Sequence, residues 1–592
     1  MNKKAEELKV DLTNVGLRSG DRRSWIKSAA TLIGGVGAAA MLTEVEAAGE
    51  KGESSEAAAK KSSAGDSGAE QATGKAQLIA NDENAIVETT AGKVRGYTRN
   101  GIQTFKGIPY AGSTEGKARF LAPAKATDWT GLRSSMQYGH DCPQAARGGW
   151  ANDEEAWLFS WDDGIPGEDC LRLNIWTPGR DNKKRPVMVW LHGGGFQAGS
   201  GQELKSYDGE RLSRRGDVVV VSLNHRIGIL GHLNLAAYGE AYANSANVGM
   251  LDIVAALEWV RDNIGNFGGD AGNVTIFGQS GGGGKVNTLM AMPSAKGLFH
   301  KAIVQSGSLM RGATVERSAA IAAEVLAELG LSGAQVGQLQ ELPYQKLIEA
   351  GVAVQRKHVR TGPPDVRRMG EQLIWSPVVD GGILPRHPFD PDAPPISAQV
   401  PMMVGTVLNE FLSGINHPEY EMMTEDEVVD RVGKLYGEKS GQIIAAFRSA
   451  HPKEKPFDIL SRIQAATVRQ GAVTQCERKA AQGAAPAYLY WFTWKTPVLD
   501  GRPRAFHCAE LAFCFDNTER CENMTGDGPE ARALAAKVSE AWIHFARTGN
   551  PNHSGIPAWP AFAAEKCQTM IFDSLCEMKI NPDTAERKAI GT

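Results

Sequence analysis

A serine on a short glycine-rich segment is the strongest nucleophile candidate in the sequence. Ser280 lies in the pattern Gly-x-Ser-x-Gly, directly after an apolar run at residues 274–277. A serine on a tight turn from a strand into a helix projects its hydroxyl from the edge of a sheet, and small neighbours permit the strained backbone. The N–H groups at the start of such a helix can bind an anion. We therefore expect Ser280 to attack an acyl carbonyl group.

A second glycine-rich segment could supply hydrogen-bond donors to the same reaction. The sequence His-Gly-Gly-Gly at residues 192–195 follows another apolar run at residues 187–191. Acyl transfer needs such donors because its tetrahedral intermediate carries a negative charge on oxygen. Removing one donor costs about 3–4 kcal/mol of transition-state stabilisation in a comparable hydrolase. The segment is thus predicted to form an oxyanion-binding loop.

The glycines around Ser280 do not match a phosphate-binding loop. Lys285 is followed by Val286 where that motif needs Ser or Thr, and the first glycine of the motif would fall on Gln279. The sequence contains neither C-x-x-C nor H-E-x-x-H. It therefore gives no support for a metal site, and we expect no cofactor.

Short apolar runs alternate with helical patterns along the chain. The predicted strands lie at residues 187–191, 218–221, 274–277, 302–305 and 402–405, with a later aromatic strand at 488–494. Helical spacing occurs between them, at 254–264 and 317–329. Strands separated by helices imply crossover connections. The sequence therefore predicts an α/β fold with a large, mostly parallel central sheet flanked by helices.

Composition excludes several classes of protein. The 592 residues carry a net charge of −4, which provides no basic field for nucleic acid. No apolar run reaches the ~20 residues that a membrane span needs. Eight cysteines are too few for a scaffold built on disulfides. The expected partner is a small molecule, and no feature indicates an oligomeric state.

The N-terminal residues have the pattern of an export signal. Arg22 and Arg23 precede an apolar, glycine-containing stretch at 28–42, and small residues follow at Ala47 and Ala48. The paired arginines resemble a twin-arginine signal. We predict an export signal at 1–48, a flexible linker at 49–84 and a folded domain at 85–592. The protein is then expected in the periplasm or outside the cell.

Several longer stretches identify a family resemblance. They are FKGIPYA at 105–111, EDCLRLNIW at 168–176, LHGGGF at 191–196, NVGMLD at 247–252, NFGGDAGNVTIFGQSGGGG at 266–284 and AWIHFARTGNPN at 541–552. Over roughly residues 85–580 the chain resembles the type-B carboxylesterases, the α/β-hydrolase group that includes the cholinesterases. The resemblance implies the α/β-hydrolase fold and hydrolysis of small carboxylic esters without a cofactor.

The resemblance also implies a Ser–Glu–His triad in that chain order. Glu410 stands in a stretch that resembles the family's G-T-x-x-x-E, and His507 in one that resembles H-x-x-E-[LI]-x-[FY]-x-F. Ser280, Glu410 and His507 would then be nucleophile, acid and base. The order agrees with α/β-hydrolase topology.

Further roles follow from the same resemblance. The oxyanion hole would consist of the N–H groups of Gly194, Gly195 and Gly281. Ser306, in QSGS, would support the triad acid. Cys142 and Cys170 match the first disulfide of the family. The sequence does not pair the remaining cysteines, which are residues 476, 508, 514, 521, 567 and 576.

The chain departs from the family pattern at three positions near these groups. Position 281 is usually Ala and here is Gly, position 508 is usually Gly and here is Cys, and position 279 is Gln where many relatives have Glu. The oxyanion donor at 281 is a backbone group, so its function does not depend on the side chain. The cysteine at 508 is expected to change the wall of the pocket.

The predicted function is hydrolysis of carboxylic esters through an acyl-enzyme. One alternative keeps the fold but changes the bond, to a carbamate, an amide or a lactone. Another is a non-catalytic, cholinesterase-like binding module. Such modules typically lose triad residues, whereas this chain retains Ser280, Glu410 and His507.

Overall fold

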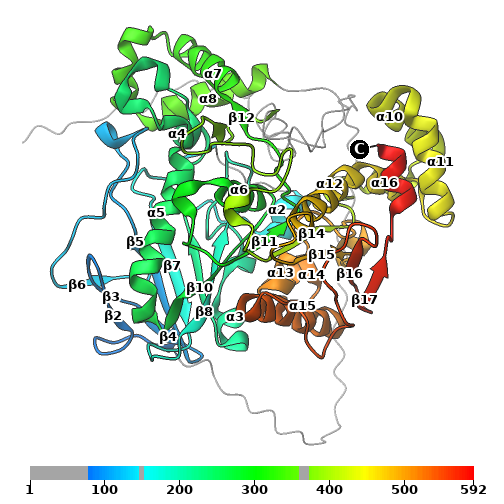
Figure 1. Cartoon of the computed structure of the whole chain (residues 1–592), viewed down its shortest axis with the longest axis horizontal. Helices are drawn as coiled ribbons and strands as arrows, with labels where there is room; N and C mark the ends of the chain where they lie inside the picture. Colours follow the sequence, from blue (N-terminus) through cyan, green and yellow to red (C-terminus); the bar gives the residue numbers. More distant parts are fainter. Residues whose placement is uncertain (1–77, 146–152, 359–371, 592) are drawn as a thin grey trace, which may run out of the picture.

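A twelve-stranded sheet forms the centre of the computed structural model, which describes residues 78–145, 153–358 and 372–591 (Figure 1). Its strand order is β1-β4-β5-β7-β9-β8-β10-β11-β14-β15-β16-β17. Neighbours from β9 to β16 run parallel, and the pairs at both margins are antiparallel. The predicted α/β class with a mostly parallel central sheet is confirmed.

The strands of this sheet are short except for β5, β8 and β10. Their bounds are β1 Leu78–Ile79, β4 Tyr97–Arg99, β5 Ile102–Pro109, β7 Arg172–Thr177, β8 Arg185–Leu191, β9 Val219–Leu223, β10 Gly269–Gln279, β11 Lys301–Gln305, β14 Met402–Val407, β15 Ala487–Phe492, β16 Gln568–Phe572 and β17 Glu577–Ile580. Two small sheets accompany it, built from β2 Ile86–Thr89, β3 Gly92–Arg95 and β6 Leu132–Ser134, and from β12 Ala313–Thr314 and β13 Val378–Val379.

The central strands are buried on both faces, as their continuous apolar runs predict. In β8, Val187, Val189 and Leu191 belong to one hydrophobic cluster, whereas Met188 and Trp190 belong to another. Successive side chains of a strand point to opposite faces, so the two clusters are the two layers of core above and below the sheet. The strand ends are thereby held rigidly from both sides.

Helices cover both faces of the sheet. The bounds are α2 Glu154–Phe159, α3 Glu210–Gly216, α4 Gly228–His232, α5 Val248–Asn263, α6 Gly281–Ala291, α7 Val315–Glu328, α8 Tyr344–Lys357, α10 Glu425–Tyr436, α11 Ser440–Ala450, α12 Pro456–Ala480, α13 Leu511–Cys514, α14 Glu522–Thr525, α15 Pro529–Thr548 and α16 Thr584–Ile590. Buried residues of α5, α6 and the C-terminal part of α12 belong to the first cluster, and those of α3 and α15 to the second; the N-terminal half of α12 packs in a separate cluster. The sheet is therefore the middle layer of three.

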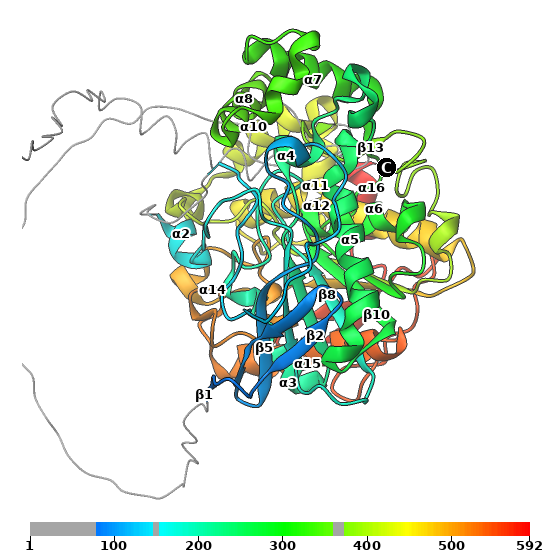
Figure 2. The same cartoon turned by 90° about the vertical axis from the view of Figure 1, so that its left-hand side faces the viewer.

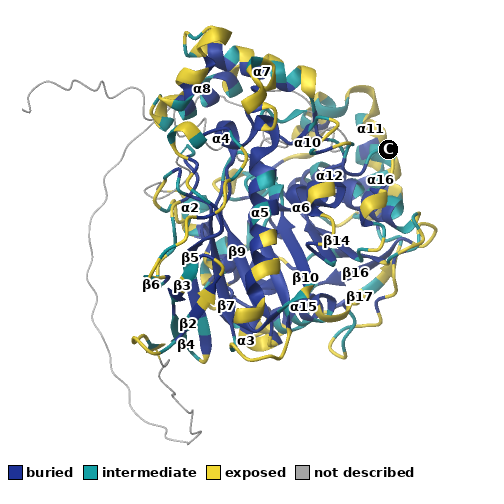
Figure 3. Ribbon diagram, turned by 60° about the vertical axis from the view of Figure 1, so that its left-hand side comes forward, coloured by how far each residue is buried: buried dark blue, intermediate teal, exposed yellow. Residues whose placement is uncertain are grey.

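Helices α7 and α8 extend beyond one end of the sheet, at the top of both Figure 1 and Figure 2. Their outward turns carry exposed residues while the strands below are buried, as Figure 3 shows. Thr314 caps α7 by accepting a hydrogen bond from the N–H of Arg317 at 3.3 Å. This cap satisfies one of the N–H groups that a helix start leaves without a partner.

The first described strand lies ahead of residue 85, where the sequence predicts the folded domain to begin. Strand β1 falls inside the predicted linker 49–84 and pairs with β4 at the edge of the sheet. Edge pairing uses backbone hydrogen bonds, and Leu78 is 62% exposed, so the hydrophobic pattern gives no sign of this strand. The predicted export signal and residues 49–77 of the linker lie outside the described residues.

Candidate active site

Ser280 forms the turn between strand β10 and helix α6. Its backbone φ is +55°, in the left-handed region that non-glycine residues rarely adopt. The turn is fixed by a hydrogen bond from the N–H of Ser280 to the carbonyl oxygen of Gln305, at 2.7 Å. Gln305 ends the neighbouring strand β11. The strained strand-to-helix turn that the sequence predicts is present.

Glycines let the predicted oxyanion loop approach this turn closely. A Cβ on Gly281 would lie 2.0 Å from the carbonyl oxygen of Gly195, and a Cβ on Gly282 would lie 2.0 Å from that of Leu191. The alanine that relatives usually carry at 281 therefore does not fit this arrangement. Gly194 and Gly195 have φ of +77° and +64°. The structure thus places the backbone of Gly194 and Gly195 beside that of Gly281.

A buried lysine holds the predicted oxyanion loop by hydrogen bonds to its carbonyl oxygens. Lys285 lies on α6 and is fully buried. Its Nζ donates to the carbonyl oxygens of His192 at 2.8 Å and Gly193 at 3.4 Å. Residues 192 and 193 directly precede the predicted oxyanion donors. Sequence reasoning missed this contact, although a lysine in an otherwise uncharged helix was a usable signal.

Glu410 follows strand β14 and is held by three different groups. Its Oε1 accepts from Ser306 Oγ at 2.8 Å and from the N–H of Val407 at 3.1 Å. Its Oε2 lies 2.6 Å from Nδ1 of His507. The carboxylate is 1% exposed. These contacts align the carboxylate of Glu410 on the imidazole of His507.

His507 meets Glu410 through backbone as well as side chain. The N–H of His507 donates to the carbonyl oxygen of Glu410 at 2.8 Å, and the Phe411 ring packs on the imidazole with centroids 4.0 Å apart. The other ring nitrogen, Nε2, lies 3.0 Å from the amide nitrogen of Gln279. No hydrogen bond joins Nε2 to Ser280 Oγ among the described residues. The imidazole of His507 is therefore oriented by Glu410 and faces Gln279.

Comparison with known proteins now identifies the family. The model of the carboxylesterase family matches residues 83–588. The chain belongs to the carboxylesterase family. It is 34% identical to the para-nitrobenzyl esterase of Bacillus subtilis, over 85% of this chain and 98% of that protein. It is 33% identical to the phenmedipham hydrolase of Pseudarthrobacter oxydans, over 81% and 93%.

Solved structures agree with this assignment. An esterase from Clostridium hathewayi, reported to hydrolyse aliphatic aromatic polyesters, superposes with a TM-score of 0.74 at 37% identity, covering 87% of this chain and 99% of that chain. A carboxylesterase of Geobacillus stearothermophilus gives 0.70 at 34% identity, over 85% and 99%. The predicted α/β-hydrolase fold and carboxylic-ester hydrolase activity are thereby confirmed.

A second glutamate of this carboxylesterase lies near the first but does not contact the base. Glu510 is fully buried, and its Oε1 accepts from the Gln305 amide at 3.2 Å. Burial, with the charge of Glu410 as a second cause, raises the pKa of Glu510 to about 8. At neutral pH Glu510 therefore holds a proton, and Glu410 supplies the negative charge beside His507.

Cys142 and Cys170, the pair for which the resemblance implies a disulfide, lie together as free thiols in the structure. All eight cysteines are among the described residues, and none is in a disulfide. A disulfide needs its sulfurs about 2.05 Å apart. Here the Cys170 thiol instead has a hydrogen-bond contact with Cys142, which with burial raises the pKa of Cys170. The disulfide remains a prediction.

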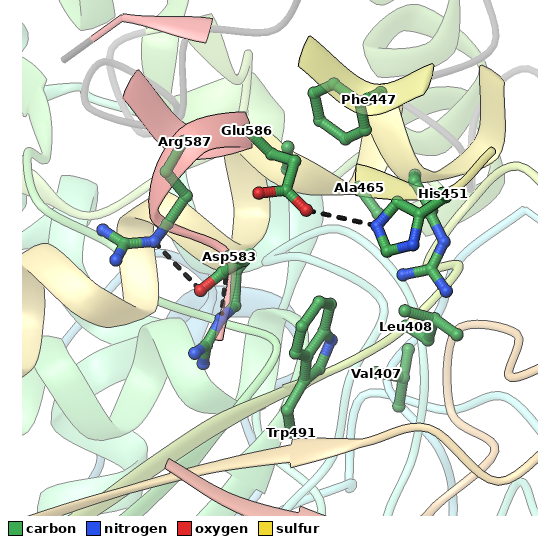
Figure 4. A pocket seen from close by; sticks show the side chains of 12 residues that line it. Val407, Leu408, Phe447, His451, Ala465, Trp491, Asp583, Glu586 and Arg587 are labelled. Atoms are coloured by element: carbon green, nitrogen blue, oxygen red, sulfur yellow. Dashed lines mark hydrogen bonds and ion pairs between the residues drawn. The ribbon is translucent and has the colours of Figure 1, made fainter. Parts of the chain in front are cut away.

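A small pocket lies away from these groups, between the end of β14 and helix α16 (Figure 4). His451 pairs with Glu586 at 3.1 Å, and Arg587 with Asp583 at 3.2 Å. Val407 lines this cavity and also binds Glu410 through its N–H. The cavity thus lies behind the strand that carries the acid, and its charged groups pair with one another.

In the part of the chain that the structure describes, no cluster of three His, Cys, Asp or Glu side chains could hold a metal ion. No single helix in it is long and apolar enough to cross a membrane; one bent pair, Val315–Glu328 with Gly333–Gln340, passes by length and composition only.

Proposed function

We propose that this carboxylesterase cleaves its ester through a Ser280–His507–Glu410 triad and an acyl-enzyme. The observation that supports this most directly is the 2.6 Å contact between Glu410 Oε2 and His507 Nδ1. That contact lies where strands β10, β11 and β14 end side by side, next to the turn of Ser280. Parallel strands bring their carboxyl ends to one edge, where α/β proteins bind ligands.

The reaction has two halves. Ser280 Oγ attacks the ester carbonyl while Nε2 of His507 takes its proton, and the resulting imidazolium gives that proton to the departing alcohol. Water then attacks the acyl-enzyme, His507 takes the proton from water and returns it to Ser280, and the carboxylic acid leaves. Glu410 keeps the imidazole in the productive tautomer and stabilises its charged form.

The developing oxyanion would be held by backbone N–H groups of Gly194, Gly195 and Gly281. Two observations support this assignment. Gly281 packs against the backbone of Gly195, and the loop carbonyls before Gly194 are fixed by Lys285. Donors that are already in place cost no reorganisation during the reaction. Ser306 acts through Glu410, which it holds by a 2.8 Å hydrogen bond.

Replacement of Ser280 by Ala tests this proposal. Turnover of p-nitrophenyl acetate is expected to disappear while the thermal unfolding midpoint stays unchanged, because the hydroxyl is not part of the core. An organophosphate should label the wild-type protein once, at Ser280, and leave the variant unlabelled. Labelling of another serine, or full turnover by the variant, would contradict the assignment.

The bond and substrate size are tested separately. We expect esters to be preferred over matched carbamates, anilides and lactones, since ester hydrolysis is what the family supports. A series of p-nitrophenyl esters of increasing acyl length, run beside the corresponding anilides, measures both properties. Higher kcat/KM for an anilide than for its ester would favour the alternative bond.

We also propose that the protein is exported through its twin-arginine-like segment. The support is the order of three features ahead of the first described strand: the arginine pair Arg22 and Arg23, then an apolar stretch, and then small residues. Lys in place of both arginines keeps the charge and removes the signal. Cell fractionation should then find the variant retained in the cytoplasm; unchanged export would indicate a general secretory signal instead.

A further inference from the structure

Helix α2 contacts the base side of the site at both of its ends. At its first residue, the N–H of Glu154 donates to Asn416 Oδ1 and the N–H of Asn416 donates to Glu154 Oε2, each at 2.8 Å. At its last residue, the Phe159 ring meets the Phe506 ring edge to face, with centroids 5.6 Å apart. Phe506 directly precedes His507. Helix α2 therefore contacts one segment that follows strand β14 and another that leads to His507.

The Glu154 carboxylate also binds the segment ahead of the base, through Arg502. Arg502 Nη2 donates to Glu154 Oε1 at 2.6 Å, and its Nη1 donates to Oε2 at 3.0 Å. Two parallel N–H donors on one carboxylate are among the strong hydrogen bonds of proteins, and they fix direction as well as distance. Hydrogen bonds from Arg502 hold the pKa of Glu154 below its ordinary range, so the carboxylate is charged at neutral pH. Glu154 thus links Asn416 to Arg502.

The two segments that Glu154 links are also bonded to each other. Arg502 Nη1 donates to the carbonyl oxygen of Gly414 at 2.9 Å, and the N–H of Gly414 donates to the carbonyl oxygen of Arg502 at 3.1 Å. Nearer the sheet, the N–H of His507 donates to the carbonyl oxygen of Glu410 at 2.8 Å. The two segments therefore meet both at the proposed acid–base pair and beside Glu154.

The partly exposed location of this ion pair separates its effect on position from its effect on stability. The side chain of Glu154 is 30% exposed and that of Arg502 is 14% exposed. Ion pairs near solvent contribute little to the free energy of unfolding. Catalysis is more sensitive, because a misplacement of about 1 Å can lower a rate about a hundredfold. Loss of the ion pair should therefore slow the reaction more than it destabilises the fold.

We propose that Glu154 is a positioning residue for the triad: from the start of α2, its carboxylate holds the segment after Glu410 against the segment before His507, and so keeps the acid aligned on the base. This inference rests on the triad proposed above. Glu154 acts through these two residues and not on the substrate, so its removal should lower kcat and leave KM unchanged.

Glu154→Gln tests the proposal with a side chain of nearly the same size. The amide carries no charge and cannot accept both N–H groups of Arg502, so kcat for p-nitrophenyl acetate should fall about tenfold with KM unchanged. Arg502→Met removes the other half of the ion pair together with the bond to Gly414, and should lower kcat at least as much. The double variant should be no slower than Arg502→Met alone, because both substitutions break the same interaction.

Glu454→Gln is the matched control. Arg462 holds Glu454 by the same two-bond arrangement, from Nε to Oε2 at 2.6 Å and from Nη2 to Oε1 at 2.5 Å. The exposed fractions are similar, 14% for the arginine side chain and 23% for the glutamate. This pair joins helix α12 to the turn before it. Its loss should lower the unfolding midpoint about as much as Glu154→Gln does, but leave kcat unchanged.

The Glu410→Gln background distinguishes a positioning role from a merely structural one. If Glu154 acts by aligning the carboxylate of Glu410, that carboxylate is already absent in this background, and adding Glu154→Gln should not lower kcat further. A general loss of folded enzyme would instead lower kcat by the same factor in both backgrounds. Thermal unfolding verifies that each variant is folded.

Three results would contradict the positioning role. They are a wild-type kcat for Glu154→Gln, equal losses of kcat for Glu154→Gln and Glu454→Gln, and an undiminished effect of Glu154→Gln in the Glu410→Gln background. Absence of organophosphate labelling at Ser280 in the wild-type protein contradicts the triad and this role together. Normal labelling of the wild type with an unaffected Glu154→Gln enzyme contradicts this role alone.

Discussion

The oxyanion side and the base side of the site are built from different materials. On the oxyanion side the candidate donors are backbone N–H groups of Gly194, Gly195 and Gly281, and the absence of side chains lets the backbones of Gly195 and Gly281 approach closely. On the base side the working groups are the side chains of Glu410 and His507, which meet at 2.6 Å. Backbone donors are set by chain geometry, whereas side-chain pairs depend on the identity of each neighbour.

The two sides also differ in what supports them. Lys285 holds the oxyanion loop by donating to two of its carbonyl oxygens. Ser306 holds Glu410, and Gln279 contacts His507. Substitutions on the base side should therefore alter proton transfer directly, and those on the oxyanion side should act through loop position.

The largest effect is expected from Glu410→Gln on the base side. The amide can no longer fix the tautomer of His507 or stabilise its charged form, and a matching Asp→Asn change in a serine protease lowers kcat about 10⁴-fold. The measurement is kcat for p-nitrophenyl acetate at saturating substrate. Glu510→Gln is the matched control, because Glu510 contacts Gln305 and not His507. If the two variants lost similar activity, Glu410 would not be the specific partner of the base.

A smaller effect is expected from Lys285→Met on the oxyanion side. The loss of the Nζ hydrogen bonds loosens the loop that carries Gly194 and Gly195. A misplaced donor should lower kcat roughly tenfold to a hundredfold, which does not exceed the decrease expected when a donor is removed completely. Stability should fall as well, because two buried carbonyl groups lose a charged donor.

Lys479→Met is the control for that stability effect. Lys479 is also fully buried, and its Nζ donates to the carbonyl oxygens of Ser397 at 3.1 Å and Ala398 at 2.7 Å, which precede strand β14, whereas Glu410 follows it. It should lower the unfolding midpoint without lowering kcat. If both lysine variants had the same kcat, the hydrogen bonds from Lys285 to the loop would not be needed for catalysis.

The comparison also explains which features could be predicted from the sequence. Ser280 and the oxyanion loop are carried by short, local patterns, and the alternation of strands and helices gave the parallel sheet. Glu410 and His507 have no local signal of their own and needed the family resemblance, since 97 residues separate them.

Contacts between segments that are far apart in the sequence could not be predicted from the sequence. The bond between Gln279 and Cys508 exists only in the folded chain. Strand β1 pairs through its backbone, which leaves no hydrophobic pattern to read. The sequence therefore specifies the backbone-built side of the site better than the side built from side chains.

The last prediction concerns stability and not turnover, and its subject is Glu510, the buried carboxyl behind the base side. Its pKa is raised from an ordinary 4.5 to about 8, first by burial and then by the charge of Glu410. Between these two values the folded protein holds a proton that the unfolded chain has released. The folded state is then the one that binds more protons, so this group makes the unfolding free energy fall as pH rises, and the fall ends above about pH 8.

Glu510→Gln removes that titration and should remove its slope. A fully titrating group contributes at most about 1.4 kcal/mol per pH unit, and the difference between variant and wild type should widen with pH up to about 8 and then stay constant. Urea unfolding at a series of pH values on both sides of this limit measures the difference. Parallel stability curves for the two proteins would mean that folding leaves the pKa of Glu510 unchanged, so that Glu510 is ionised at neutral pH near Glu410.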